Sequence, residues 1–181
     1  MEIYRHRDQK DPLVVVLDFS GIESLTSSYT KSSILWLLRC GEKSVGASVY
    51  DDPGDGSLPV ALPIYLILAH LSDEVREEIE VVLRAEQLCC LVAVETKGES
   101  VLTVSILGSL DRTLRTTLRR VEVETETTAA ALHAKHDDDI NVTGWNNRLS
   151  DLHRLRLLHR RKEGRQWIYA ILAPLKENNN G

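Results

Sequence analysis

Apolar residues occur in short runs through the first part of the chain, and turn residues bound each run. Runs of this length and composition predict buried β-strands, and they cover residues 13–17, 62–68, 88–94 and 101–107. Between these runs, the hydroxyl cluster at residues 26–28 predicts the start of a helix from about residue 29 to 39, and an amphipathic pattern predicts a helix from 72 to 84. Gly41 is the expected stop of the first helix, and Ser72 is the expected N-cap of the second. Strands that alternate with helices predict an α/β layer domain.

Helical spacing dominates after residue 108. A helix is expected at 109–120, with Asp111 in its first turn, and another at 129–136, with Thr127 or Thr128 as its cap. Residues 121–124 alternate between apolar and polar, so they fit either a short strand or a continuation of the first of these helices.

The segment from Asn141 to Ile171 carries the strongest pattern. Thr143 is the predicted N-cap of a further helix, because its hydroxyl can accept a free amide of the first turn. One apolar face of this helix follows from the spacing i, i+4 and i+7, and it consists of Trp145, Leu149 and Leu152. The opposite face is polar and carries Asn147, Ser150, Asp151 and Arg154.

A β-hairpin with a cationic tip is expected directly after that helix. Residues 159–162 (HRRK) form a basic strand, Glu163-Gly164 form a tight turn, and residues 167–169 (WIY) form an aromatic return strand. A helix followed by a basic hairpin is the winged helix-turn-helix arrangement, in which the helix contacts DNA bases and the hairpin contacts phosphates.

This segment resembles the recognition helix and wing of winged-helix transcriptional regulators. The matching residues are Thr143, Asn147, Arg148, Leu149, Leu152, Leu157, Leu158, Arg160, Gly164, Arg165 and Tyr169. The family usually has glycine before the leucine pair, and this chain has Arg156, which would adopt a left-handed conformation at a cost of roughly 1 kcal/mol unless the helix ends later. The candidate DNA-contacting residues are Thr143, Asn146, Asn147, Arg148, Ser150, Arg154, Arg160, Arg161, Lys162, Arg165 and Gln166.

A second resemblance lies in the first half. Residues 18–22 (DFSGI) follow a predicted strand, and Ser27-Ser28 open a predicted helix. This pattern resembles the STAS domains of anti-sigma factor antagonists, and more closely the smaller STAS-like domains, over roughly residues 10–107. Thr26 and Tyr29 replace the aspartate and glycine that flank the serine pair in true antagonists. The resemblance makes Ser27 a candidate phospho-acceptor, and the alternative is that Ser27 is a plain N-cap.

The net charge of −5 conceals an uneven distribution. Residues 1–108 contain 9 Lys and Arg against 17 Asp and Glu, a balance of −8, whereas residues 109–181 contain 13 against 10, a balance of +3. Within residues 141–170 the counts are 7 and 2. A basic segment attached to an acidic partner favours contact with a polyanion, although an ordinary solvated basic face is the alternative.

Other chemistry finds little support in the sequence. Cys40, Cys89 and Cys90 lack metal or redox spacing and are expected to be buried thiols of a cytoplasmic protein. His133 and His136 precede three aspartates at a spacing that is poor for a metal site, and residues 51–59, which include Gly54-Asp55-Gly56, predict a loop and not a nucleotide-binding loop. We therefore expect no catalytic site, no metal, no cofactor and no membrane-spanning segment.

Together these patterns predict an α/β STAS-like domain at residues 1–108 and an α+β winged helix-turn-helix domain at residues 109–181. The expected function is a DNA-binding transcriptional regulator whose first domain senses a signal, dimerises or docks a regulatory protein. The alternative is a protein-interaction switch of the anti-sigma-antagonist type, in which the winged helix docks protein. The expected partners are double-stranded DNA and a second copy of the chain. Each domain is expected to form its own core.

Overall fold

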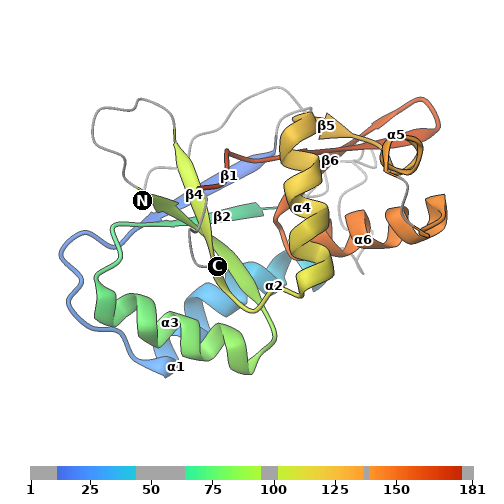
Figure 1. The fold of residues 1–181 in the computed structure, drawn as a ribbon. Coiled ribbons are helices and arrows are strands. Elements are labelled where there is room, and N and C mark those ends of the chain that lie inside the picture. Colours follow the sequence, from blue (N-terminus) through green and yellow to red (C-terminus); the bar gives the residue numbers. More distant parts are fainter. Residues whose placement is uncertain (1–11, 44–63, 95–101, 137–138, 177–181) are drawn as a thin grey trace, which may run out of the picture.

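The computed structural model describes residues 12–43, 64–94, 102–136 and 139–176. It is a mixed α/β protein with one four-stranded and one three-stranded sheet (Figure 1). The loop predicted at 51–59 and the side chain of Cys40 lie outside the described residues. The elements of the first half are β1 (Leu13–Asp18), α1 (Ser27–Thr30), a π-helical segment (Lys31–Leu35), α2 (Trp36–Lys43), β2 (Ile64–Ala69), α3 (Asp73–Ala85), β3 (Cys89–Val94) and β4 (Thr103–Gly108).

The first helical stretch runs without a break from Ser27 to Lys43. The side chain of Thr26 caps it, because its hydroxyl accepts a hydrogen bond from the Tyr29 amide at 3.2 Å. The predicted stop at Gly41 is wrong, since α2 continues through this position. Glycine within a helix costs only about 1 kcal/mol, so a single glycine does not end a helix that packs on a sheet.

The four-stranded sheet has the order β1-β2-β3-β4. Strands β1, β2 and β3 are parallel, with Leu13 paired to Ile64 and Ile67 paired to Leu91, and β4 is antiparallel to β3. Gly108 ends β4 at φ 99°, where a Cβ atom would lie 2.5 Å from the Leu88 carbonyl oxygen. Only glycine fits this position without a shift of the backbone.

Two hydrophobic cores lie on opposite faces of this sheet. Neighbouring strand residues point to opposite faces, so Cys90 and Val92 belong to one core, whereas Cys89 and Leu91 belong to the other. The first core is completed by helices of the first half, through Ile34, Leu38, Val75, Ile79 and Leu83. The second core is completed by the second half, through Leu118, Leu132, Trp145, Leu149, Leu152 and Tyr169.

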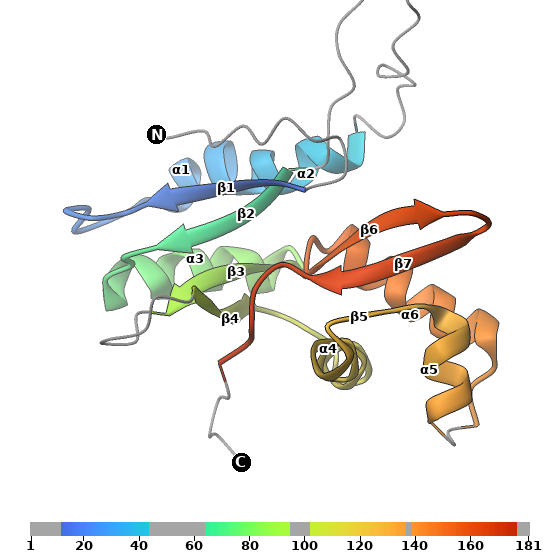
Figure 2. The same ribbon diagram turned by 90° about the horizontal axis from the view of Figure 1, so that it is seen from above.

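The described residues of the second half form three helices and a small antiparallel sheet of order β5-β7-β6. Its elements are α4 (Arg112–Glu124), β5 (Glu126–Thr127), α5 (Ala129–Lys135), α6 (Val142–Arg154), β6 (Leu158–Glu163) and β7 (Gln166–Ile171). Figure 2 shows the β6–β7 hairpin extending away from the four-stranded sheet. The two-residue strand β5 had no signal in the sequence.

The structure decides three sequence predictions for these helices. Asp111 is the N-cap of α4 and not a first-turn residue, because its Oδ1 accepts the amides of Thr113 (2.7 Å) and Leu114 (3.2 Å). Residues 121–124 continue α4, so the alternative of a strand is wrong. Of the two threonines proposed to cap α5, it is Thr128 whose hydroxyl accepts the Ala131 amide.

The chain after β7 closes an edge of the four-stranded sheet. The Val104 amide of β4 donates to the Pro174 carbonyl at 2.9 Å, and the Lys176 amide donates to the Val104 carbonyl at 2.8 Å. The Leu175 amide donates to Oε1 of Glu122 on α4 at 2.6 Å. Residues 174–176 therefore join the β4 edge to α4, and they pair backbone groups that an edge strand would otherwise expose.

Side chains also connect β2 to the end of α6. The Tyr65 hydroxyl lies 3.4 Å from Nδ1 of His153, and the Arg156 guanidinium lies 6.0 Å from the centre of the Tyr65 ring. One continuous hydrophobic core thus contains residues from both sides of the predicted boundary at residue 108. The sheet is consequently covered on both faces, as parallel sheets usually are.

Candidate nucleic-acid interface

The N-terminus of α6 is fixed by Asn141 and not by Thr143 as predicted. The Asn141 Oδ1 accepts the Gly144 amide at 2.8 Å, and the helix begins at Val142. Asparagine is at least as good an N-cap as threonine, so the earlier residue takes this role. Thr143 becomes the second residue of the helix and is exposed.

The C-terminus of α6 ends in a left-handed residue that is not glycine. Arg156 has φ 61°, its amide donates to the His153 carbonyl, and the Leu157 amide donates to the Leu152 carbonyl, both at 3.0 Å. These two bonds define a Schellman motif. Its Arg156 side chain is only 6% exposed and packs over Tyr65. The predicted left-handed arginine is confirmed, and the alternative of a later helix end is wrong.

The outward face of α6 carries amide and hydroxyl groups with one ion pair. Thr143, Asn146 and Asn147 are exposed. The Arg154 guanidinium is exposed and lies 3.2 Å from the Asp151 carboxylate. Exposed pairs of this kind contribute at most about 1 kcal/mol, so a stronger anion could displace Asp151 from Arg154.

The side chain of Arg148 lies against Trp145, a residue of the same helix. Its guanidinium lies 5.5 Å from the centre of the Trp145 ring, and that of Arg120 on α4 lies 5.2 Å from the same ring. Trp145 itself is fully buried, with the His136 ring 6.0 Å away. Arg148 is half-buried. The contact of Arg120 with Trp145 connects α4 to α6.

The β6–β7 hairpin turns through a two-residue loop, Gly164-Arg165, and not at the predicted Glu163-Gly164, because Glu163 is still part of β6. Glu163 pairs with Gln166, and Gly164 has φ 58°. A glycine with positive φ at the first loop position is typical of tight hairpin turns whose twist matches that of the strands. Arg165 and Gln166 are therefore exposed at the tip, beside the exposed Lys162.

The cationic side chains on the two faces of the hairpin have different partners. Lys162 is paired across the strands with Trp167, and Arg160 lies on the same face, with its guanidinium 4.2 Å from the centre of the Trp167 ring. Trp167 is 39% exposed, so these side chains present charge and aromatic surface together. Arg161 lies on the other face, and its guanidinium donates to both carboxylate oxygens of Glu126 on β5, at 2.7 and 3.2 Å.

The Arg161–Glu126 pair stabilises both charges. Hydrogen bonding to Arg161 lowers the pKa of Glu126, and the same bonds raise the pKa of Arg161. Arg161 is therefore less available to a phosphate than Lys162 or Arg165.

Two half-buried contacts join α6 to the hairpin. The Ser150 hydroxyl lies 3.3 Å from the Tyr169 hydroxyl, and His153 Nδ1 lies 3.0 Å from the Leu158 carbonyl oxygen. Burial lowers the pKa of His153 from 6.5 to about 4, so this imidazole is neutral at pH 7 and its Nδ1 donates to Leu158. Ser150, predicted to face DNA, is half-buried and contacts Tyr169 of the hairpin instead.

Residues 18–22 (DFSGI) and the serine pair Ser27-Ser28 in the first half have their own local geometry. Asp18 Oδ1 accepts the Ser20 hydroxyl at 2.6 Å and the Ser20 amide at 2.8 Å, and His70 Nδ1 lies 2.7 Å from it. These bonds, led by that of the Ser20 side chain, lower the pKa of Asp18 to about 2. Ser27 is exposed and is the first residue of α1, with Thr26 as the N-cap, so Ser27 is not the plain N-cap that was the alternative to a phospho-acceptor.

Some of these residues were not found from the sequence. Tyr65 and Glu126 act through contacts with segments far away in the chain, and no local pattern marks such residues. His153 contacts both Tyr65 and Leu158, which lies five residues later. His70 follows the last residue of β2 and has a positive φ of 56°, although it is not at the end of a helix. A histidine at the end of an apolar run was the available signal.

Metal and thiol chemistry find no geometric support in the described part of the chain. No group of three or more His, Cys, Asp or Glu side chains there could hold a metal ion. Cys89 and Cys90 are buried, and burial raises the pKa of both thiols, that of Cys89 to about 12. Among the described helices, none is both long and apolar enough to cross a lipid bilayer.

Neither models of known protein families nor curated proteins give a match to this chain. Its function therefore has to be inferred from its residues and their geometry.

Proposed function

We propose that the chain is a cytoplasmic DNA-binding transcriptional regulator. In this proposal residues 109–181 act as a winged helix-turn-helix domain, with α6 in the major groove and β6–β7 as the wing. The first half acts as a STAS-like module that senses a signal, dimerises or docks a regulatory protein. The observation that carries the proposal is the surface formed by α6 and the hairpin, which combines exposed amides with cations.

The order of elements supports this assignment. Three helices, α4, α5 and α6, are followed directly by an antiparallel hairpin, and β5 adds a third strand to it. The Ser150–Tyr169 and His153–Leu158 contacts fix the orientation of the helix relative to the hairpin. Such fixation matters, because a helix in the major groove and a wing on the backbone must reach the same duplex together.

The exposed side chains of α6 suit contact with bases, and those of the hairpin suit contact with phosphates. Asn146 and Asn147 on α6 can each make paired hydrogen bonds to adenine, and Arg154 can reach guanine if Asp151 releases it. Lys162 and Arg165 are exposed at the wing tip and can contact phosphates.

The second candidate is a protein-interaction switch. It is favoured by Asp151 at the outward face of α6 and by the Arg161–Glu126 pair, because both reduce the positive potential of the surface. The exposed Trp167 fits a protein partner as well as a nucleic acid. The two candidates differ in their dependence on salt, since phosphate contacts release counterions.

A gel shift with genomic DNA fragments at several salt concentrations tests the proposal. Each phosphate contact contributes a slope of about −0.9 to the log–log salt dependence. We expect the double substitution Lys162→Ala/Arg165→Ala to weaken binding to all fragments alike and to flatten the slope by roughly 2. Arg161→Ala should flatten it less, because Glu126 already neutralises this side chain.

The matched control is Lys31→Ala/Arg84→Ala, which removes the same charge from exposed positions in the first half. Its slope should equal that of the unchanged chain. If both double variants behave identically, or if the chain binds no DNA at low salt, the wing is not a phosphate-binding element and the protein-docking candidate gains.

Sequence discrimination has a separate test in Asn147→Ala. Loss of one paired contact to a base costs about 1–3 kcal/mol of discrimination. We expect the variant to lose base preference at one position in a randomised-site selection and to keep its non-specific affinity. An unchanged preference would assign base recognition to other residues.

A further inference from the structure

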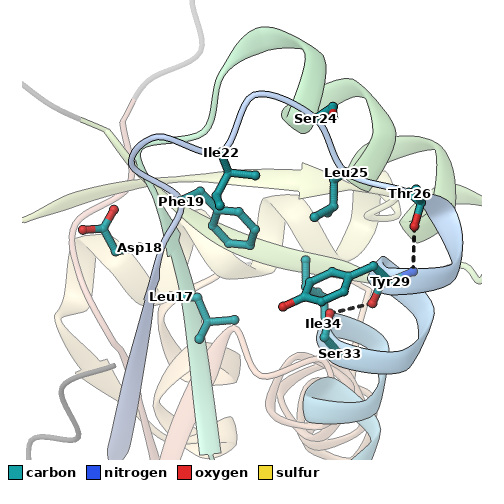
Figure 3. A pocket seen from close by; sticks show the side chains of 10 residues that line it. All are labelled: Leu17, Asp18, Phe19, Ile22, Ser24, Leu25, Thr26, Tyr29, Ser33 and Ile34. Carbon is teal, nitrogen blue, oxygen red and sulfur yellow. Dashed lines mark hydrogen bonds between the residues drawn. The ribbon is translucent and has the colours of Figure 1, made fainter.

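A cavity of about 490 Å³ opens beside the carboxyl end of β1 (Figure 3). Its apolar lining comes from the end of β1, from the β1–α1 connection and from the helix after it: Leu17, Phe19, Ile22, Leu25, Tyr29 and Ile34. The carboxyl ends of parallel strands are the usual place for ligands in open α/β sheets. The volume lies within the range of about 300–1,000 Å³ that small-molecule sites occupy.

The aromatic ring of Tyr29 reaches across this cavity. Figure 3 shows it extending from the helix toward Leu17, with the side chains of Phe19, Ile22 and Leu25 above it in that view. Tyr29 is 56% exposed and Ile22 is 42% exposed. An occupant of the cavity would cover this apolar surface, and the Tyr29 hydroxyl offers it one hydrogen-bonding group.

The charge of the lining limits what can bind. Among the described residues that line the cavity, Asp18 alone is charged. Its side chain lies on the other side of β1 in Figure 3, where Ser20 and His70 hold the carboxylate. Within the described part of the chain, no lining residue carries a positive charge for an anion. Burial of an unpaired charge against apolar side chains is unfavourable.

We propose that this cavity binds an uncharged, largely apolar small molecule that contacts the Tyr29 ring and hydroxyl. The sensing role that such a ligand would give the first half rests on the proposed function. The binding itself does not, and it is tested without DNA, so failure of one proposal is distinguishable from failure of the other.

Nile red, an uncharged dye whose fluorescence rises in apolar surroundings, is the probe for the full-length chain. We expect saturable binding with one site per chain. Ile22→Trp fills the cavity from its exposed rim, and Ser33→Phe fills it from the helix. Each should weaken Nile red binding by at least about tenfold. The anionic dye 1-anilinonaphthalene-8-sulfonate should bind more weakly than Nile red.

Val123→Trp is the matched control, because Val123 is an exposed β-branched residue on α4, 82% exposed and outside the cavity. It should leave the affinity unchanged, and circular dichroism should show that all three variants keep the fold. Non-saturable binding, equal affinities in the cavity variants and Val123→Trp, or tighter binding of the anionic dye would each overturn the proposal.

Discussion

The two faces of the β1–β4 sheet differ in where their cover comes from. On one face, Cys90 and Val92 pack against helices that connect the strands of the same sheet. On the other face, Cys89 and Leu91 pack against a core that α4, α5, α6 and the hairpin provide. Residues adjacent in the chain thus depend on segments that are near in sequence in one case and distant in the other.

This difference means that the two halves of the chain do not have fully separate cores. An uninterrupted apolar run such as residues 88–94 already indicates a strand buried on both faces. It does not indicate which segment covers the second face. A boundary drawn from charge and motif alone, at residue 108, crosses a shared core.

The largest expected effect comes from cutting the chain at that boundary. The sequence predicted that residues 1–108 fold alone and self-associate. A fragment of these residues would expose Ile67, Leu91 and Val104, all at most 2% exposed in the whole chain. We expect it to lose cooperative thermal unfolding, or to self-associate through this face. Ultracentrifugation and calorimetry of the fragment and of the whole chain measure both.

Self-association of the fragment would therefore not show that the whole chain is a dimer. The whole chain has to be monomeric or dimeric in its own measurement. The contrary result is a fragment that stays monomeric and unfolds cooperatively, as stable as the same residues are in the whole chain. It would show that the sheet is stable without the second half packed on it, and that the two halves fold independently.

A matched pair of core substitutions sharpens the comparison. Leu83 in the first core and Leu149 in the second are both 0% exposed. Leu→Ala at such sites costs about 2–5 kcal/mol. If the sheet couples the two cores, either substitution lowers the stability of one common unfolding transition. Calorimetry with two separate transitions, of which each variant shifts only one, would contradict this coupling.

The pH dependence of stability tests the contact between β2 and α6. Burial holds the pKa of His153 at about 4, below its usual 6.5, so the unfolded chain binds a proton on this residue before the folded chain does. Its contribution to stability is complete above pH 6.5 and is lost as the pH falls toward 4. Arg156, Arg160 and His159 face the imidazole and oppose its protonation further.

We expect His153→Gln to flatten the decline of unfolding free energy between pH 6.5 and 4.5, measured by urea denaturation. Asp18 and Asp111 have the ordinary aspartate pKa of 3.8 when the chain is unfolded, so their loss of stability on protonation falls mostly below this window. His133→Gln, at an exposed position on α5, is the control. An equal slope in both variants would remove His153 from this role.

The smallest effects concern two helix ends with the same backbone conformation. Gln87 after α3 has φ 55° and an exposed side chain, whereas Arg156 after α6 has φ 61° and a buried one. Gln87→Gly should raise the unfolding free energy by about 1 kcal/mol, because glycine adopts positive φ without strain. Arg156→Gly should raise the unfolding free energy by less, or lower it, because this substitution also removes the contact with Tyr65. Equal gains, measured by urea denaturation, would show that the Arg156 side chain contributes nothing.

Local signals in the sequence located most elements, and they were weakest at helix ends. Trp145, Leu149 and Leu152 were expected on one face of a helix, and all three are fully buried. Thr143 and Gly41 were misjudged, because several residue types can cap or continue a helix and packing decides among them.

The candidate site was predictable in its types of residue and not in their pairings. The sequence indicated a cationic hairpin, but it could not show that Arg161 pairs with Glu126, 35 residues earlier, while Arg160 stacks on Trp167. Glu126 belongs to a strand of two residues, too short for any periodicity. The shared core was equally hidden, since both of its halves look like ordinary amphipathic elements.

The pairing of β1 with β2 has a consequence for folding kinetics. Leu13 pairs with Ile64, 51 positions later, whereas the β6–β7 hairpin closes between Glu163 and Gln166. Closing a long loop costs entropy before any contact repays it, so non-local strand pairs form slowly. We expect β1 to dock after β3 and β4 have paired, and pulse-labelled amide exchange would detect this order. Until then, the apolar strand β2 is an uncovered edge and a site of aggregation during refolding.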